Sequence, residues 1–286
     1  MTLTMKAATR ASTRWSQSLA GWALAAAALA PGFAPLAAQA QKLPPGAIFT
    51  AIHNIPEKNV DADSVELENG VISTYWYGHE FDVAGRHFFT GFVWNTRDAE
   101  ARKGEDVAAP DVQVKIAQAT FERTHPGKTP AYSFYAVERK TGQFGGREKP
   151  PEVDPSRKPL EFHTQDNRMV LAVPTRTFDN GVALDGYATF LFTLKKEFEL
   201  HEWLWAYTGS VQTGEDNAAA CDGGAVMPCA SSTGTLSFVA GAGGLPQIRV
   251  VPAGTTIAGP GKTRALGAAD AQTYRFDEKT RKYVSE

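Results

Sequence analysis

Two stretches of the sequence consist almost wholly of β-branched and aromatic residues, and they lie a short distance apart. Residues 71–77 read Val-Ile-Ser-Thr-Tyr-Trp-Tyr, and residues 87–94 read His-Phe-Phe-Thr-Gly-Phe-Val-Trp. Such residues favour strands, where branched and ring side chains pack on a pleated surface. The segment between them, residues 78–86, has a glycine near each end. This pattern predicts two antiparallel strands joined by a loop.

Further segments have the same character and are bounded by turn residues. We expect strands at 47–53, 111–116, 132–138, 169–173, 187–194, 198–211, 235–239, 248–251 and 273–276. Helix is expected only as a short turn at 99–102 and, as an alternative to a strand, at 116–123. About ten short strands with little helix predict an all-β fold, either an antiparallel β-sandwich or a barrel, with long irregular loops.

Two segments differ from the strands in composition. Residues 142–159 combine glycines, prolines and charged residues, and residues 214–244 are rich in alanine, glycine and serine. Both compositions are typical of loops or linkers rather than of strand interiors. The sequence has no convincing repeat on the two sides of 142–159. We therefore expect a single β-rich domain over 41–286, with 142–159 as the alternative place for an internal boundary.

The first 40 residues have the features of a signal peptide. Lys6, Arg10 and Arg14 form a basic start without acidic residues, and residues 19–30 form an apolar run. That run has about a dozen residues, whereas a membrane-spanning helix needs about 20. Residues 38–40 read Ala-Gln-Ala, which suits cleavage after residue 40. We expect a soluble mature protein, periplasmic or secreted, without a transmembrane segment.

The exported part of the chain holds both cysteines of the sequence, Cys221 and Cys229. Two thiols eight positions apart in an oxidising compartment are expected to form one disulfide. The turn-forming residues between them let the two ends meet. The Cys-x-x-Cys spacing of a catalytic dithiol is missing, so redox catalysis is not expected.

The charges of the chain are nearly balanced, with 29 Lys and Arg against 31 Asp and Glu among 286 residues. This balance excludes a protein that coats nucleic acid through a basic surface. The sequence also lacks a glycine-rich nucleotide-binding motif and the Gly-x-Ser-x-Gly motif of serine hydrolases.

The densest group of potential metal ligands lies around the segment between the two aromatic strands. His79, Glu80, Asp82 and His87 fall within nine residues, next to Arg86. Imidazole and carboxylate groups are ligands for zinc or iron, so a divalent metal is the one cofactor that the sequence suggests. The spacing matches no metal-binding motif. The alternative is a polar loop in which Glu80 and Asp82 pair with Arg86.

More distant residues extend the metal hypotheses. His163, His201 and Glu202 are candidates to complete a site around the two histidines of the loop. Oxygen-rich loops also suit calcium, although the Asp-x-Asp-x-Asp-Gly pattern is absent and solvated acidic loops are the alternative. The acidic candidates are Asp61, Asp63, Glu66, Glu215, Asp216 and Asp222.

Aromatic residues concentrate in three of the expected strands, and strand periodicity divides them between two faces. One face fills the core, while the other is available to stack on sugar rings or to anchor a protein partner. The alternative is that all the rings lie in the core, as is usual for aromatic strands. The candidates for a binding face are Tyr75, Trp76, Trp94, Trp203 and Trp205.

These features favour an exported, soluble β-rich binding or interaction protein of the bacterial-type cell envelope, whose partner is an envelope glycan or another protein. The alternative is a metal-assisted hydrolase that uses His79 and His87 with a bound water as nucleophile. A third hypothesis is a protective partner, such as a periplasmic inhibitor of a toxic enzyme, for which an acidic mature chain suits a basic target.

Overall fold

The computed structural model describes residues 43–56, 63–194, 203–241 and 244–286, which belong to one compact unit, Gln41–Glu286. Strands account for 56% of the residues and helices for 8%, which confirms the predicted all-β class. The predicted signal peptide, Asp61, His201 and Glu202 lie outside the described residues. None of the described helices has the length and apolar character that crossing a membrane requires.

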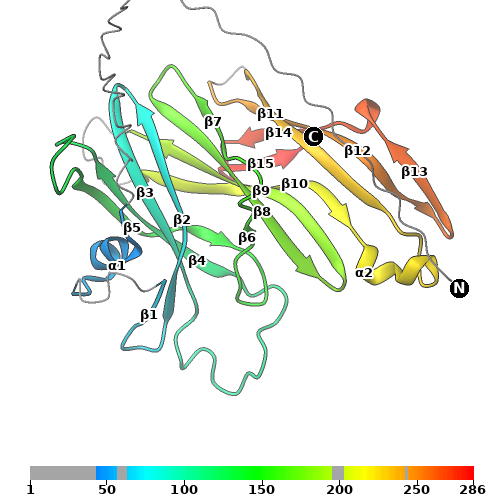
Figure 1. The fold of residues 1–286 in the computed structure, drawn as a ribbon, viewed down its shortest axis with the longest axis horizontal. Helices are drawn as coiled ribbons and strands as arrows, with labels where there is room; N and C mark the ends of the chain where they lie inside the picture. The colour runs from blue at the N-terminus through cyan, green and yellow to red at the C-terminus, as the bar shows by residue number, and fades with distance from the viewer. Residues whose placement is uncertain (1–42, 57–62, 195–202, 242–243) are drawn as a thin grey trace, which may run out of the picture. The chain divides into compact units, whose positions relative to one another are not determined.

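The first sheet contains the two aromatic stretches and has the order β1-β2-β3-β4-β5 (Figure 1). Its strands are β1 (Ser64–Glu66), β2 (Ile72–Val83), β3 (Arg86–Asn95), β4 (Val114–Glu122) and β5 (Ser133–Phe144). Every pair is antiparallel, and the spatial order follows the order in the chain. The sheet is therefore a meander of sequential neighbours, the simplest arrangement for antiparallel strands.

The second sheet is larger and follows the order β15-β14-β12-β11-β10-β9-β8-β6, with β13 paired to β12 and β7 paired to β8. Its strands are β6 (Glu152–Val153), β7 (Leu160–His163), β8 (Arg168–Asp179), β9 (Val182–Thr193), β10 (Trp205–Asp216), β11 (Ser231–Val239), β12 (Gln247–Gly259), β13 (Lys262–Leu266), β14 (Gln272–Asp277) and β15 (Lys282–Ser285). Short helical segments α2 (Ala218–Cys221), η2 (Asp222–Gly224) and η3 (Ala268–Asp270) lie in its connections. β11 lies wholly inside the stretch 214–244, and it contains the predicted strand at 235–239 and extends it toward the N-terminus into residues predicted to be irregular.

The main core lies between the two sheets, so the fold is sandwich-like. Rings from β2 and β3 meet rings from β9 and β10 there, for example Phe92 with Phe190 at 4.8 Å and Phe81 with Trp205 at 5.4 Å between centroids. Trp205 is fully buried in this core. The aromatic alternation of the sequence thus supplies much of the inner face of both sheets.

A buried polar network crosses the same core. The Trp205 indole Nε1 donates to Thr90 Oγ1 at 3.1 Å, and the Thr90 and Thr120 hydroxyls lie 2.8 Å apart. The Glu138 carboxylate accepts the backbone N–H groups of Leu204 at 2.5 Å and of Trp205 itself at 2.9 Å. Glu138 on β5 therefore ties the first sheet to the start of β10 in the second.

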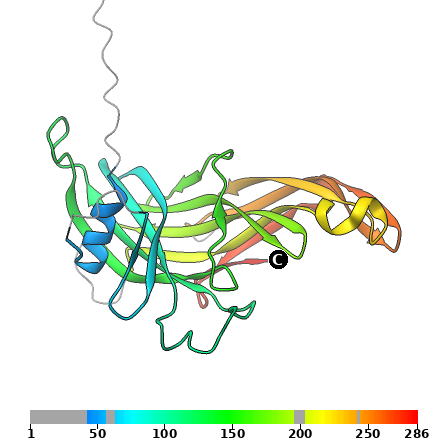
Figure 2. The same cartoon turned by 60° about the horizontal axis from the view of Figure 1, so that its bottom comes forward.

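The second sheet coils, and a separate core fills the inside of the coil. β10 and β11 share only two residue pairs, Glu215 with Ser232 and Asp216 with Ser231, so the sheet changes direction between them. Side chains of β8–β10 then pack against those of β11, β12 and β15. The strands can approach closely because Gly214 and Gly234 face backbone carbonyls that a Cβ atom would overlap. Figure 2 shows the orange strands of this coil extending away from the cyan strands of the first sheet.

Residues 47–53, predicted as a strand, are helical instead. The helix α1 (Pro45–His53) begins after Pro44 and ends at Asn54, which has a left-handed conformation. Its buried residues are Gly46, Ile48, Phe49 and Ile52, and the three large ones pack on the outer face of the first sheet. The composition of the segment is that of a strand, but the spacing of its large buried positions is that of a helix.

The prediction of a loop at 78–86 is also wrong. β2 and β3 continue through this segment to a two-residue turn at Ala84 and Gly85, which have φ values of 53° and 73°. Two successive residues with positive φ are typical of the tight turns that match the twist of a hairpin. A second tight turn joins β8 to β9 at Asn180 and Gly181, which have φ values of 50° and 81°. Residues 116–123 lie largely in β4, which excludes the helical alternative.

Candidate functional site

The aromatic residues predicted to form a binding face lie in different environments. Trp205 belongs to the core, as described above. Trp76 lies at a bulge of β2, donates from Nε1 to the Pro151 carbonyl at 2.9 Å and packs on the core with Trp94. Tyr75 faces the opposite side of the first sheet, toward α1. Trp203, which is 40% exposed, is thus the member of the set with a substantially open ring.

Trp203 borders a surface hollow of about 300 Å³, here called the Trp203 pocket. Strand ends from β8, β9 and β14 and the turn after β14 surround it. Its lining residues are Arg168, Leu191, Thr193, Trp203, Phe276, Glu278 and Arg281. Arg168 is held in place by Asp166, with 2.8 Å between Nη2 and the carboxylate oxygen. The pocket therefore combines two aromatic rings with two guanidinium groups, a carboxylate and a hydroxyl.

The predicted metal ligands are divided between the two faces of the first sheet. The rings of Tyr77, His79 and Phe81 stack along the face that meets the second sheet, with 5.9 Å and 6.2 Å between successive centroids. Asp82 and His87 are cross-strand partners on the opposite face. Because alternate residues of a strand point to opposite faces, His79 and His87 do not meet at one site.

His87 lies in a polar cluster on the outer face. Its Nδ1 is 3.0 Å from Asp82 Oδ1, and its Nε2 is 3.3 Å from the Tyr132 hydroxyl. Tyr132 donates to Glu80 Oε1 at 3.2 Å. Burial, together with the nearby Glu80 carboxylate, raises the pKa of Tyr132 to about 12. The phenol therefore stays protonated, and the cluster holds the hairpin to the segment before β5 without providing an anionic nucleophile.

His79 joins a second cluster, between the two sheets. Glu161 on β7 accepts from His79 Nε2 at 2.6 Å with one oxygen and from His163 Nε2 at 2.7 Å with the other. Burial alone raises the pKa of Glu161, but the hydrogen bonds from the two imidazoles outweigh it and lower that pKa. The Tyr77 hydroxyl lies 3.4 Å from His79 Nδ1. Glu161 is the member of this cluster that the sequence did not single out.

Neither cluster is arranged as a metal centre. Within the described ranges, no group of three or more His, Cys, Asp or Glu side chains is placed to hold a metal ion. The metal hypothesis for His79, Glu80, Asp82 and His87 stays a prediction, and the geometry gives it no support.

The cysteine prediction is confirmed, because Cys221 and Cys229 lie at disulfide distance, with 2.03 Å between the sulfur atoms. The disulfide joins the last residue of α2 to Cys229 and closes the segment that contains η2. Among the acidic residues considered for calcium, Asp216 accepts from the Ala218 N–H at 2.8 Å and from the Ser231 hydroxyl at 3.2 Å. Asp216 thus fixes the start of α2 and is the last residue of β10, not part of an open loop.

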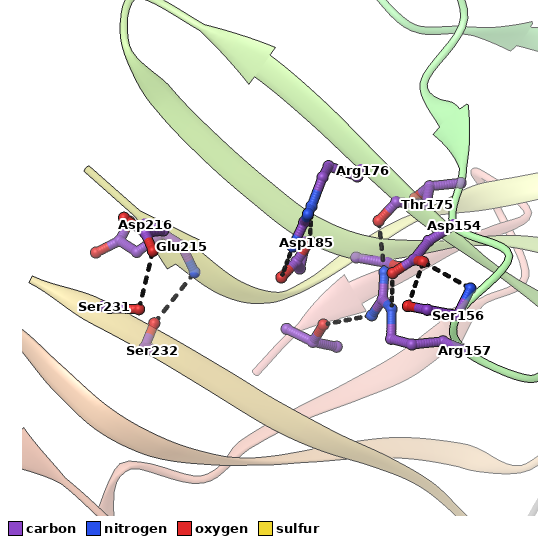
Figure 3. A network of polar contacts seen from close by, with 12 residues as sticks. Asp154, Ser156, Arg157, Thr175, Arg176, Asp185, Glu215, Asp216, Ser231 and Ser232 are labelled. Carbon is purple, nitrogen blue, oxygen red and sulfur yellow. Dashed lines mark hydrogen bonds and ion pairs between the residues drawn. The ribbon is translucent and has the colours of Figure 1, made fainter. Parts of the chain in front are cut away.

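The charged stretch 142–159 contains a polar network that the sequence did not reveal (Figure 3). Arg157 donates from Nε to Asp154 at 2.8 Å and from Nη2 to the carbonyl oxygens of Thr175 at 2.6 Å and Gly186 at 3.0 Å. It thereby fastens the loop after β6 to β8 and β9. The signal that the sequence offered, Asp154 three residues before Arg157, is too common to identify such a contact.

Comparison of the chain with protein-family models, with curated proteins and with solved structures finds no match. The functional argument therefore rests on the placement of side chains. Of the groups described above, the Trp203 pocket is the one that combines an exposed aromatic ring with hydrogen-bonding groups around a hollow.

Proposed function

We propose that this chain is an exported binding protein of the bacterial-type cell envelope, and that it contacts an envelope glycan through the Trp203 pocket. The observation that carries the proposal is the exposed ring of Trp203 beside charged and polar side chains. A sugar ring presents an apolar face, which stacks on an aromatic ring, and hydroxyl groups at its edge, which bind polar side chains.

Two observations support export. The disulfide between Cys221 and Cys229 is of the kind that persists in oxidising compartments. The first 40 residues carry the basic start, apolar run and small residues that are typical of a secretory signal.

The alternative function, a metal-assisted hydrolase, depends on His79 and His87 acting together. The two histidines lie on opposite faces of the first sheet, and each is hydrogen-bonded to a separate carboxylate. This placement does not support a site that uses both imidazoles, so we favour binding over metal-assisted hydrolysis.

Co-sedimentation with purified peptidoglycan sacculi tests the proposal. We expect the wild-type protein to sediment with the sacculi, and Trp203→Ala to weaken binding roughly tenfold, since loss of an aromatic anchor costs on the order of 1–2 kcal/mol. Phe178→Ala is the matched control, because Phe178 is a 66% exposed aromatic residue near the end of β8 and does not line the pocket. Equal binding of wild type and Trp203→Ala, or no binding of the wild type, contradicts the proposal.

A further inference from the structure

A second hollow, of about 400 Å³, opens where the second sheet coils, and it is here called the polar hollow. The polar hollow and the Trp203 pocket lie toward opposite ends of β9. Gly214 in the wall of the polar hollow pairs with Asp185 near the start of β9, whereas Leu191 and Thr193 near its end line the Trp203 pocket. The lining residues of the polar hollow are Gln212, Thr213, Gly214, Glu215, Ser232, Val250, Pro252, Thr256, Arg264, Leu266, Asp270, Gln272 and Tyr274. Hollows at the mouths of coiled or closed sheets are frequent ligand sites.

The polar hollow follows directly from the coil of the sheet. β10 and β11 separate after their two shared residue pairs, while β12, β13 and β14 continue around the opening. The walls are therefore strands and the short segment η3 rather than long loops. A site built on strands holds its side chains in fixed positions before a ligand arrives.

Several lining groups are fixed by hydrogen bonds inside the hollow. Arg264 Nη2 lies 2.8 Å from Asp270 Oδ1, which anchors β13 to η3. The Tyr274 hydroxyl donates to Gln272 Oε1 at 2.8 Å, and burial raises the pKa of Tyr274, so the phenol keeps the proton that it donates. This bond orients the Gln272 amide nitrogen, a hydrogen-bond donor, for other partners.

Several of the charges at this end of the sheet are paired. Figure 3 shows two of the neutralised pairs, Arg157 with Asp154 and Arg176 with Asp185, whose closest atoms are 2.8 Å and 2.7 Å apart. The Arg264–Asp270 pair is a third. Among the described residues that line the hollow, Glu215 is the carboxylate for which no ion pair is found.

Asp216 follows Glu215 in β10 but does not line the hollow. Its hydrogen bonds come from a backbone N–H and a hydroxyl. The hydrogen bond to Asp185 raises the pKa of Arg176 and the Asp216 charge adds to that shift, so the Arg176 guanidinium partly offsets the Asp216 charge. The preference for a charged ligand therefore depends on Glu215. A ligand that carries a positive charge is favoured beside this carboxylate over a neutral analogue of the same shape.

We propose that the polar hollow binds an amino sugar, with its ammonium group at Glu215. The amide groups of Gln212 and Gln272 both donate and accept hydrogen bonds, as sugar hydroxyls do. Pro252, Leu266 and the ring of Tyr274 provide apolar surface for the face of the sugar ring. The site is separate from the Trp203 pocket and does not depend on the function proposed there.

Calorimetric titration of the exported full chain with glucosamine and with N-acetylglucosamine tests this inference, because the two sugars differ in the charge of the amino group. We expect glucosamine to bind about fivefold more tightly at low salt, since a partly exposed ion pair contributes on the order of 1 kcal/mol. The preference should disappear in Glu215→Gln. Glu100→Gln, a carboxylate-to-amide change at a side chain that is 82% exposed and outside the hollow, is the matched control and should keep the preference.

Two further measurements keep the test decisive. If Glu215→Gln does not fold, the wild-type preference for glucosamine should fall as salt is raised, because screening weakens an ion pair. Trp203→Ala should leave the titration unchanged, so a failure of the glycan proposal does not affect this result. Equal affinity of the wild type for both sugars, absence of saturable binding, or a preference that survives Glu215→Gln would overturn the inference.

Discussion

Replacing Glu138 with alanine provides a direct test of how the two sheets are held together. The Glu138 carboxylate accepts the backbone N–H groups of Leu204 and Trp205 and the side-chain amide of Gln118, at 2.5, 2.9 and 3.2 Å. Leu204 and Trp205 are 3% and 0% exposed. The substitution therefore leaves two backbone donors without their partner at the edge of the main core.

A buried N–H group without a partner costs about 1–3 kcal/mol, so two such groups cost about 2–6 kcal/mol. Glu138 itself is partly exposed, which lets water reach some of the vacated space. We therefore expect Glu138→Ala to lower the free energy of unfolding by about 2–4 kcal/mol. Glu138→Gln keeps one acceptor oxygen but places an amide donor against the other N–H, so its loss should be roughly half as large.

Urea unfolding followed by tryptophan fluorescence measures these differences. Glu100→Ala is the control for loss of a surface carboxylate and should stay within about 0.5 kcal/mol of the wild type. A Glu138→Ala variant as stable as this control would refute the assignment of Glu138 as a tie between the sheets. A variant in which glutamine is less stable than alanine would also contradict the hydrogen-bond account.

Two further perturbations test the coil of the second sheet and the loop that Arg157 fastens. Gly234→Ala places a Cβ atom against the Thr213 carbonyl and should lower the free energy of unfolding, measured with urea, by about 1–3 kcal/mol. Gly267 faces open space, so Gly267→Ala is the control and should leave the free energy of unfolding nearly unchanged. Hydrogen bonds from Ser156 and Arg157 lower the pKa of Asp154 from 3.8 to about 2, and they outweigh burial, which alone would raise it. The ionised Asp154 carboxylate therefore stabilises the fold fully above about pH 4. Asp154→Asn should be less stable than the wild type at pH 6. The difference in the free energy of unfolding, measured with urea, should shrink as the pH falls toward 2.

The strand content was predictable because it depends on local alternation. The aromatic stretches at 71–77 and 87–94 lie in neighbouring strands, and Asn180-Gly181 forms the turn that its sequence indicates. The helix α1 was missed because it contains isoleucine, phenylalanine and threonine, which also favour strands. Its helical state is decided by Pro44 and Pro45 at its start and by packing on a sheet formed later in the chain.

The candidate sites were less predictable, because they depend on which residues face the same way across distant strands. The four ligands proposed around the first hairpin are close in sequence and were expected in a loop. In the structure they lie in paired strands joined by a two-residue turn at Ala84-Gly85, and the alternation of these strands places His79 and His87 on opposite faces. His87 does pair with Asp82 across this turn, but the other partners of the two histidines, Tyr132 and Glu161, lie 45 and 82 positions away. No spacing rule within one segment identifies such partners.

The distinction between structural and ligand-binding polar groups lies in whether their partners are already present. His79, His87 and Arg157 each have defined partners in the protein, and a ligand would have to displace them at a cost. Glu215 lines the polar hollow without an ion pair among the described residues, and the partly exposed Trp203 lines the other hollow. The polar hollow lies where β10 and β11 separate, and the Trp203 pocket lies toward the opposite end of β9. The coiled second sheet therefore carries both places where binding is expected.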